Sequence, residues 1–200
     1  MQYVIGIDEA GRGALAGPVS AGAVLMPHDF DWREVFALVT RRGTPRLRDS
    51  KQLSPQQRNT LFECITAHGG LRYTCGFVEA RGIDEIGIVN SAREAAAVAL
   101  RELGVRPGRA RVLLDAGLSV SSQWEQEAFV RGDENIPAIA LASIIAKVTR
   151  DRHMDDLALA HPHYGFERHK GYGTREHYAA LRAHGPLPIH RKTFLSHNIS

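Results

Sequence analysis

Short apolar runs alternate with longer amphipathic stretches along this chain of 200 residues. Runs rich in β-branched, aromatic or small apolar residues predict strands at residues 3–7, 19–26, 71–78 and 111–114. Apolar residues at helical spacing predict helices at residues 56–68, 88–103, 136–156 and within 171–183. The start of the third helix, residues 136–140, is equally compatible with a strand. Strands that alternate with helices predict an α/β fold.

Local signals support several of these boundaries. Ser54 and Pro55 are typical of a helix N-cap and first turn, and Gly69-Gly70 ends the helix that they begin. Residues 162–172 set off a small C-terminal helical part. We therefore expect a single domain, residues 1–200, with a helical segment from about 160–200.

Charge is distributed unevenly along the chain. Lys and Arg number 25 against 22 Asp and Glu, and the formal net charge of +3 permits a polyanionic partner. Residues 41–58 are locally basic, with one acid, Asp49, and six basic residues: Arg41, Arg42, Arg46, Arg48, Lys51 and Arg58. Two cysteines indicate neither a disulfide framework nor a thiolate metal site. With no signal-like start and no apolar run of membrane-spanning length, we expect a soluble cytoplasmic protein.

Two acids directly follow predicted buried strands. Asp8 comes after residues 4–7 and Asp115 after residues 112–114, so both are expected where strands meet loops. Mg²⁺ and Mn²⁺ take oxygen ligands, and a nuclease built around them needs carboxylates from several elements. The competing interpretation is that either acid merely caps the next turn or helix.

The pair Asp8-Glu9 is harder to explain by capping alone. It precedes Gly11-Arg12-Gly13, a loop whose backbone can approach phosphate closely. A second Ile-Asp-Glu triplet, at residues 83–85, has no buried strand before it and no such loop after it, and we interpret it as a charge at a helix N-terminus. The combination at residues 8–13 favours metal-dependent chemistry on a phosphodiester.

Residues 6–13, Gly-Ile-Asp-Glu-Ala-Gly-Arg-Gly, resemble the signature of the ribonuclease HII family. Family-like stretches follow in order over nearly the whole chain: 49–53, 114–116, 132–133, 142–152, 169–174 and 188–191. The resemblance implies a ribonuclease H-like fold, a mixed central β-sheet flanked by helices. It also implies a set of four catalytic and metal-binding acids: Asp8, Glu9, Asp115 and Asp133. Asp151 stays outside this set, because its place in a helical run favours a surface or intrahelical ion pair.

Two stretches depart from the family pattern. After Gly132-Asp133 the family usually has a basic residue within a few positions, whereas this chain has Glu134-Asn135. The common Ala-Ala-Ala-Ser reads Ala-Leu-Ala-Ser at residues 140–143. These departures concern local phosphate contact and the tuning of Asp133, and they leave the reaction class unchanged.

The resemblance implies the reaction as well. The enzyme would cut the RNA strand of RNA/DNA hybrids and cut 5′ of ribonucleotides embedded in duplex DNA, with Mn²⁺ or Mg²⁺ as cofactor. Its products would carry 5′-phosphate and 3′-hydroxyl ends. In the family, the Gly-Arg-Gly loop and a tyrosine read the junction between a ribonucleotide and the next deoxyribonucleotide. Tyr172 matches that tyrosine, Tyr164 is the competing choice, and a structural half-buried ring is the alternative for either.

Further side chains are candidates for contact with the substrate. The full substrate-binding set is Gly11, Arg12, Gly13, Ser50, Lys51, Lys147, Lys170, Tyr172 and Arg191. A zinc site could be imagined through His169, His177, His184 and His190. Their spacings match no compact ligand pair, so histidines that face solvent or nucleic acid are expected instead.

Two other functions stay open at this point. One is a nuclease with the same metal site and another substrate, such as a strand transferase or a DNA-junction endonuclease. The other is a non-catalytic nucleic-acid-binding module that uses the basic stretches. Nothing indicates an obligate oligomer, so a monomer is expected, and the sequence does not decide whether a sliding clamp is a partner.

Overall fold

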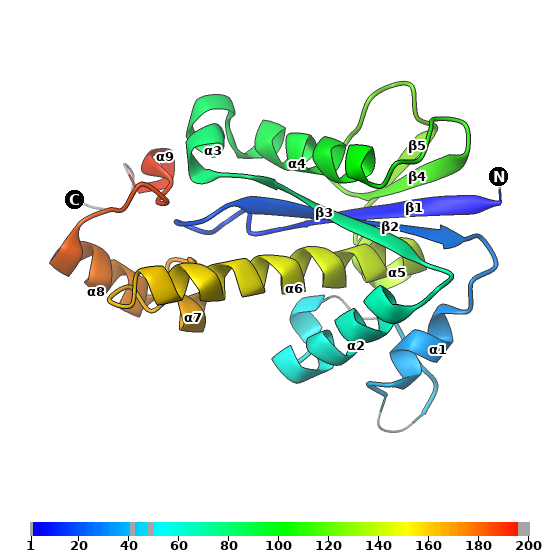
Figure 1. Cartoon of the computed structure of the whole chain (residues 1–200), viewed down its shortest axis with the longest axis horizontal. Coiled ribbons are helices and arrows are strands. Elements are labelled where there is room, and N and C mark those ends of the chain that lie inside the picture. Colours follow the sequence, from blue (N-terminus) through cyan, green and yellow to red (C-terminus); the bar gives the residue numbers. More distant parts are fainter. Residues whose placement is uncertain (1, 41–42, 48–49, 196–200) are drawn as a thin grey trace.

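A mixed five-stranded sheet forms the centre of the molecule (Figure 1). The computed structural model describes residues 2–40, 43–47 and 50–195. The strands are β1 Tyr3–Ala10, β2 Val19–Pro27, β3 Arg72–Val78, β4 Ala110–Asp115 and β5 Gln126–Phe129. Their order is β3-β2-β1-β4-β5, with β1-β2 and β2-β3 antiparallel and β1-β4 and β4-β5 parallel. The four predicted strands are confirmed, and β5 is an additional edge strand.

Helices cover both faces of this sheet. They are α1 Trp32–Ala37, α2 Pro55–Ala67, α3 Ala80–Ile86, α4 Ile88–Glu102, α5 Gly132–Asn135, α6 Pro137–Ala160, α7 Phe166–His169, α8 Arg175–His184 and α9 Lys192–Leu195, with a 3₁₀ turn at Ser50–Gln52. Ser54 caps α2 through a capping box with Gln57, as the Ser-Pro signal predicts. Because α6 begins at Pro137, the ambiguous stretch 136–140 is helical apart from its first residue.

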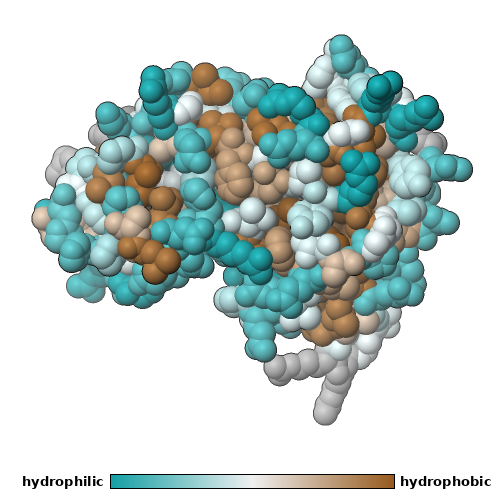
Figure 2. Space-filling model, in the orientation of Figure 1, coloured by the Kyte–Doolittle hydropathy of each residue, from teal (hydrophilic) through white to brown (hydrophobic). Residues whose placement is uncertain are grey.

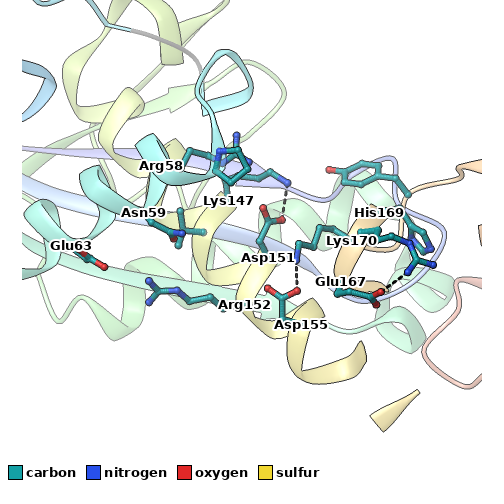
Figure 3. Close-up of a pocket in the computed structure, with 14 residues that line it drawn as sticks. Arg58, Asn59, Glu63, Lys147, Asp151, Arg152, Asp155, Glu167, His169 and Lys170 are labelled. Atoms are coloured by element: carbon teal, nitrogen blue, oxygen red, sulfur yellow. Dashed lines mark hydrogen bonds and ion pairs between the residues drawn. The ribbon is translucent and has the colours of Figure 1, made fainter. Parts of the chain in front are cut away.

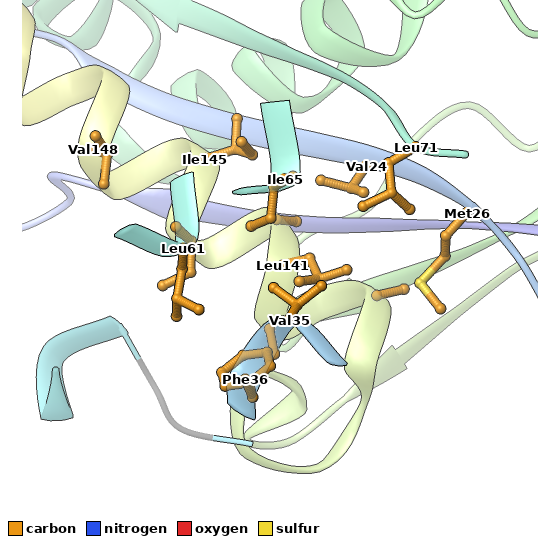
Figure 4. Close-up of a cluster of buried hydrophobic side chains, with 14 of the residues drawn as sticks. Val24, Met26, Val35, Phe36, Leu61, Ile65, Leu71, Leu141, Ile145 and Val148 are labelled. Carbon is orange, nitrogen blue, oxygen red and sulfur yellow. The ribbon is translucent and has the colours of Figure 1, made fainter. Parts of the chain in front are cut away.

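Two hydrophobic clusters occupy the two sides of the sheet. Along β1, Val4 packs toward α6, whereas Ile5 and Ile7 pack with α4, as the alternation of a strand requires. The α6 side also receives Phe36 of α1 and Leu61 of α2 (Figure 4). α3 and α4 therefore lie on one face of the sheet, and α1, α2 and α6 lie on the other (Figure 1).

Three strand glycines let α4 and α6 lie directly against the sheet. A Cβ added at Gly6 would stand 2.0 Å from the carbonyl carbon of Ala138, and one at Gly22 would stand 2.4 Å from the carbonyl oxygen of Ala142. On the other face, a Cβ at Gly76 would meet the carbonyl oxygen of Ala95 at 2.2 Å. Only glycine allows this approach, which fixes the position of α6 and of every functional side chain that it carries.

The C-terminal helices pack as a third hydrophobic cluster. This cluster joins Phe166 and Leu181 to Met154 of α6 and to Leu15 and Ala16, which follow the Gly-Arg-Gly loop. Two isolated bridges, Ala14 with Tyr172 and Ala16 with His190, tie the same segments together. The segment expected from about residue 160 thus begins where α6 ends, while the single-domain assignment stays a prediction.

Asp84 differs from its predicted role. It lies inside α3 and caps a distant helix, since its carboxylate accepts hydrogen bonds from the backbone N–H groups of Lys192 and Thr193 at 2.9 and 3.0 Å. The triplet was predicted to place a charge at the N-terminus of the helix that follows it. Asp84 instead caps α9, because a contact 108 residues away in the chain determines its role. Within the described ranges, no helix is both long and apolar enough to cross a membrane.

Candidate active site

Carboxylates from two neighbouring strands meet at one end of the sheet. β1 and β4 are parallel with Ile7 opposite Leu114, so Asp8 of β1 stands next to Asp115, the last residue of β4. Ligand oxygens of Asp8, Glu9 and Asp115 all lie within 4.8 Å of one another. Among the residues that the structure describes, this is the one group of three such side chains close enough to share a metal ion.

The fourth predicted acid, Asp133, borders this group. It lies in α5 and is buried. Its neighbour Gly132 donates its backbone N–H to Asp115 Oδ1 at 2.9 Å, which fixes α5 against the end of β4. The charge of Asp133 also contributes to the raised pKa of Asp8, although less than burial, Glu9 and Asp115 do. Asp133 is thus close enough to act on Asp8 but lies outside the group of three.

Burial and mutual repulsion disfavour the ionised forms of the site's carboxylates. Asp8 is 6% exposed, and burial followed by repulsion from Glu9 and Asp115 raises its pKa well above the ordinary value. Burial also raises the pKa of Glu9, against the influence of Arg12, whose Nη1 donates to Glu9 Oε1 at 3.1 Å. The other oxygen, Glu9 Oε2, is buried without a hydrogen-bond partner in the described part of the chain. Three hard oxygen donors and an unpartnered carboxylate oxygen fit a divalent cation.

A cavity of about 410 Å³ opens beside Glu9. Its lining is Glu9, Ala10, Gly11, Arg12, Gly13, Ser50, Lys51, Lys147 and Tyr172. Seven of the nine predicted substrate residues therefore line one pocket next to the carboxylates, although the loop after β1, the 3₁₀ turn, α6 and the loop after α7 supply them from distant parts of the sequence.

A second hollow of about 550 Å³ continues from this pocket and shares Lys147 and Tyr172 with it. It lies between α2, α6 and α7, and in the space-filling view hydrophilic side chains border the indentation there (Figures 2 and 3). Lys147 pairs with Asp151 at 2.7 Å, and Lys170 pairs with Asp155 across the same hollow (Figure 3). The intrahelical ion pair predicted for Asp151 is thus confirmed, with Lys147 as its partner.

The structure corrects the placement of Arg191. Its side chain is fully buried, and it donates from Nε to the carbonyl oxygen of Gly17 at 3.0 Å and from Nη1 to that of Arg12 at 2.9 Å. A buried guanidinium behind the Gly-Arg-Gly loop does not reach a substrate backbone, so the predicted direct contact was wrong. The sequence could not show this burial, because the partners of Arg191 lie more than 170 positions away in the chain.

Sequence reasoning missed Arg150. Arg150 is fully buried and donates to the carbonyl oxygens of Pro18 at 2.9 Å, Lys170 at 3.0 Å and Ala16 at 3.3 Å. It thereby joins the Gly-rich loop to the segment that carries Tyr172. A basic residue within an otherwise buried helical run was the one available signal.

The two candidate tyrosines have different surroundings. Tyr164 is 6% exposed, and its hydroxyl donates to the carbonyl oxygen of Gly185 at 2.5 Å. Tyr172 is half-buried and lines the pocket, with Lys147 Nζ 5.7 Å and the Arg150 guanidinium 5.4 Å from its ring centroid. The placement favours Tyr172 as the ring available to substrate. Of the basic stretch, Arg41, Arg42, Arg48 and Asp49 lie outside the described residues.

The family model for ribonuclease HII matches residues 5–197. The chain belongs to the ribonuclease HII family. A ribonuclease HII of Bacillus licheniformis is 43% identical over 96% of this chain and 69% of its own length. A ribonuclease HII of Geobacillus kaustophilus is 44% identical over 97% and 68%. Among solved structures, ribonuclease H2 from Pyrococcus horikoshii matches with a TM-score of 0.73 and 28% identity over 96% of this chain and 93% of that one.

Family membership confirms both the resemblance and the expected ribonuclease H-like fold. As a ribonuclease HII-family enzyme, the chain is an endonuclease that acts on RNA/DNA hybrids with the help of a divalent metal ion, and its acidic group provides suitable ligands. A further solved relative, the PCNA:RNase HII complex from Archaeoglobus fulgidus, matches with a TM-score of 0.70 and 26% identity over 94% of this chain and 93% of that one.

Three histidines of this ribonuclease HII-family chain are buried, contrary to expectation: His169 is 7% exposed, His177 0% and His190 1%. Burial, and next the neighbouring His177, lower the pKa of His190 from 6.5 to about 4. As the pH falls, His190 is protonated near pH 6.5 in the unfolded state but only near pH 4 in the folded state. The free energy of unfolding is therefore highest above pH 6.5 and decreases as the pH falls toward 4. The loss would amount to about 3 kcal/mol.

Urea unfolding measured at several pH values tests this prediction. Between pH 6.5 and 4.5, the slope of unfolding free energy against pH should be about 1 kcal/mol per pH unit smaller in His190→Gln than in the parent. His184→Gln, which removes an exposed histidine of α8, serves as the matched control and should keep the parent slope. Equal slopes in the parent and His190→Gln would contradict the prediction.

Proposed function

We propose that Asp8, Glu9, Asp115 and Asp133 hold two Mg²⁺ or Mn²⁺ ions for phosphodiester hydrolysis, with Asp8 and Asp115 as shared ligands. Bound there, the two cations supply an activated water for in-line attack and stabilise the leaving 3′ oxygen, which gives 5′-phosphate and 3′-hydroxyl ends. The observation that carries this proposal is the group of three buried or half-buried acids next to the Gly-Arg-Gly pocket. Glu9 would use its unpartnered Oε2, and Asp133 would complete the coordination from α5.

We further propose that the pocket selects ribose. The 2′-hydroxyl both donates and accepts hydrogen bonds, and it distinguishes RNA from DNA. Gly11 has a φ of +89°, and a Cβ there would stand 2.0 Å from Arg150 Nε, so this position requires glycine. The carbonyls of Arg12, Ala16 and Gly17 accept from the two buried arginines, which fixes the backbone of the loop from behind.

Positive side chains around the pocket would hold the phosphates. Lys51 and Lys147 line the pocket itself, and Lys170 lines the adjoining hollow. Arg191 supports the loop from the interior instead. The substrates we propose are RNA/DNA hybrids and, more specifically, duplex DNA with embedded ribonucleotides, whose removal would be the biological task. We expect the enzyme to act as a cytoplasmic monomer, which sedimentation of the purified protein would test for the oligomeric state.

A cleavage assay tests the proposed substrate directly. The parent protein should cut a DNA duplex with one ribonucleotide and a long RNA/DNA hybrid, and leave plain DNA intact, with Mg²⁺ and Mn²⁺ supplied separately. The single cut should fall 5′ of the ribonucleotide. Cleavage of plain DNA at a comparable rate would exclude ribose selection and favour another nuclease chemistry on the same fold.

Replacing Tyr172 separates ribose selection from hydrolysis. Base stacking on an aromatic ring contributes about 1–3 kcal/mol, so Tyr172→Ala should reduce cleavage at a single ribonucleotide roughly 10-fold or more relative to cleavage of a long hybrid. Tyr164→Phe removes only the hydroxyl that binds Gly185 and should leave this ratio unchanged. If Tyr164→Phe changed the ratio and Tyr172→Ala did not, the role would belong to Tyr164.

A further inference from the structure

Three buried histidines, His169, His177 and His190, form a cluster through ring stacking and one hydrogen bond, and this cluster contacts the backbone of Tyr172. The rings of His169 and His177 stack at a centroid distance of 4.5 Å and an interplanar angle of 13°. His177 Nε2 lies 3.0 Å from His190 Nε2. The fully buried Phe166 presents its ring nearly perpendicular to those of His169 and His177, at 82° and 87°. This histidine cluster lies in the C-terminal part and shares no residue with the carboxylate group.

The hydrogen bonds determine which nitrogen of each ring carries the proton. His190 Nδ1 accepts from the backbone N–H of Leu187 at 2.9 Å, so the proton of neutral His190 is on Nε2 and is donated to His177 Nε2. His177 must then carry its own proton on Nδ1, and it donates that proton to the carbonyl oxygen of Tyr172 at 3.0 Å. A directed chain therefore runs from Leu187 through two rings to the backbone of Tyr172.

His169 completes the cluster. Its Nδ1 accepts from the N–H of Gly171 at 3.3 Å, which puts the proton on Nε2, 2.9 Å from the carbonyl oxygen of Tyr164. All six ring nitrogens of the cluster therefore have protein partners, and none is left to bind zinc. The cluster must have a role other than metal binding.

The segment that the cluster holds has an unfavourable backbone. Lys170 has a φ of +50° and Gly171 a φ of +82°, and a non-glycine residue in the left-handed region persists only when its surroundings enforce it. The contacts of His169 and His177 with Gly171 and Tyr172 provide this enforcement, together with the bond from Arg150 to the carbonyl of Lys170. Tyr172, which belongs to the same segment, lines the pocket.

We propose that His177 and His190 are positioning residues that hold the backbone of Tyr172 so that its ring faces the junction in the substrate. This inference rests on the proposed function, since it needs Tyr172 to read that junction. His190 acts through His177, and His177 acts through the Tyr172 carbonyl. Only neutral rings complete the chain. Protonation of His177 would place two N–H groups against each other at its 3.0 Å contact with His190, and protonation of His190 would do so at its 2.9 Å contact with Leu187.

A pair of His177 variants tests the proposal. In His177→Asn, the side-chain amide can take the place of Nδ1–H and still donate to the Tyr172 carbonyl, whereas His177→Leu has a similar volume and no donor. We expect His177→Leu to lower cleavage at a single ribonucleotide roughly 10-fold relative to a long RNA/DNA hybrid, which is the factor for about one lost hydrogen bond with a buried partner. His177→Asn should recover most of that loss.

A double variant distinguishes positioning from a general loss of stability. Since His177 acts through Tyr172, adding His177→Leu to Tyr172→Ala should lower the substrate ratio no further. An additive loss, or a ratio unchanged in folded His177→Leu, would overturn the inference. If Tyr172→Ala itself left the ratio unchanged, the proposed role of Tyr172 would fail instead. If His177→Leu does not fold, His190→Met can replace it in the comparison of the two substrates. This variant removes the donor to His177 and leaves the His177 ring itself unchanged.

The tautomers provide a readout independent of activity. Nitrogen-15 NMR of the parent protein at neutral pH should find the proton on Nδ1 in His177 and on Nε2 in His169 and His190. In His190→Met, the Nε2 resonance of His177 should shift, because that nitrogen loses its donor. A proton found on Nε2 of His177 would contradict the directed chain, and with it the support for Tyr172.

Discussion

Asp8→Asn should abolish cleavage while it leaves the binding of a nucleic-acid duplex largely intact. Asparagine has nearly the shape of aspartate but lacks the negative charge that Asp8 would share between two cations. We expect the rate to fall roughly 1000-fold or more, equivalent to about 4 kcal/mol in the activation free energy. Single-turnover cleavage and fluorescence anisotropy on a one-ribonucleotide duplex measure the two quantities separately. Unchanged cleavage would remove Asp8 from the site.

The same variant should be more stable than the parent in the absence of metal. Because burial, Glu9 and Asp115 raise the pKa of Asp8, its ionised form destabilises the fold at any pH above that raised pKa. The gain from Asp8→Asn should therefore be largest at pH 8, roughly 1–3 kcal/mol, and should disappear as the pH falls toward the ordinary pKa of aspartate. With saturating Mn²⁺ the parent should become more stable than Asp8→Asn, since we expect the parent to bind the metal and the variant not to bind it.

Asp156→Asn is the matched control for the loss of one negative charge outside the site. Asp156→Asn removes an exposed acid from α6 that takes no part in the site. It should change neither the cleavage rate nor the melting temperature by more than a small amount. A comparable gain in stability from Asp156→Asn would mean that the general charge of the protein, and not repulsion within the acidic group, causes the effect.

Gly6→Ala should have the largest effect on stability. The new Cβ would stand 2.0 Å from both the carbonyl carbon and the carbonyl oxygen of Ala138, and 2.6 Å from the nitrogen of Ile139. These are backbone atoms of α6, which cannot rotate away as a side chain can, so the helix must move off the sheet. We expect a loss of about 3 kcal/mol or more in unfolding free energy, measured by urea denaturation.

Gly69→Ala is the matched control for this substitution. No atom lies within 4 Å of a Cβ built at Gly69, and its φ is outside the left-handed region, so the variant should be as stable as the parent or slightly more so. If Gly6→Ala were equally well tolerated, α6 would not lie against β1 at the distance described. Activity should fall in Gly6→Ala even where it folds, because α6 carries Lys147 and Arg150.

Much of the scaffold could be predicted from the sequence because it depends on local patterns. β1 and β4 each contain a short apolar run, residues 4–7 and 112–114, directly followed by an acid, and parallel pairing brings Asp8 and Asp115 together. Ser54 and Pro55 likewise fix the start of α2 through bonds within one turn. β5 could not be predicted, since its four residues, Gln-Glu-Ala-Phe, have no marked apolar pattern and form a strand only because β4 offers an open edge.

The sequence by itself determined the α/β class, the four main strands, the family and the acids that follow two of the apolar runs. Each of these features depends on a local pattern of a few neighbouring residues: alternation, capping or a contiguous motif. Only the tertiary structure decided the surroundings of long polar side chains. It buried Arg150, Arg191 and the three histidines, and it placed Tyr172 rather than Tyr164 in the pocket. The physical reason is that the partners of these side chains are backbone groups brought close by packing between distant segments, such as the bridges of Ala14 with Tyr172 and Ala16 with His190.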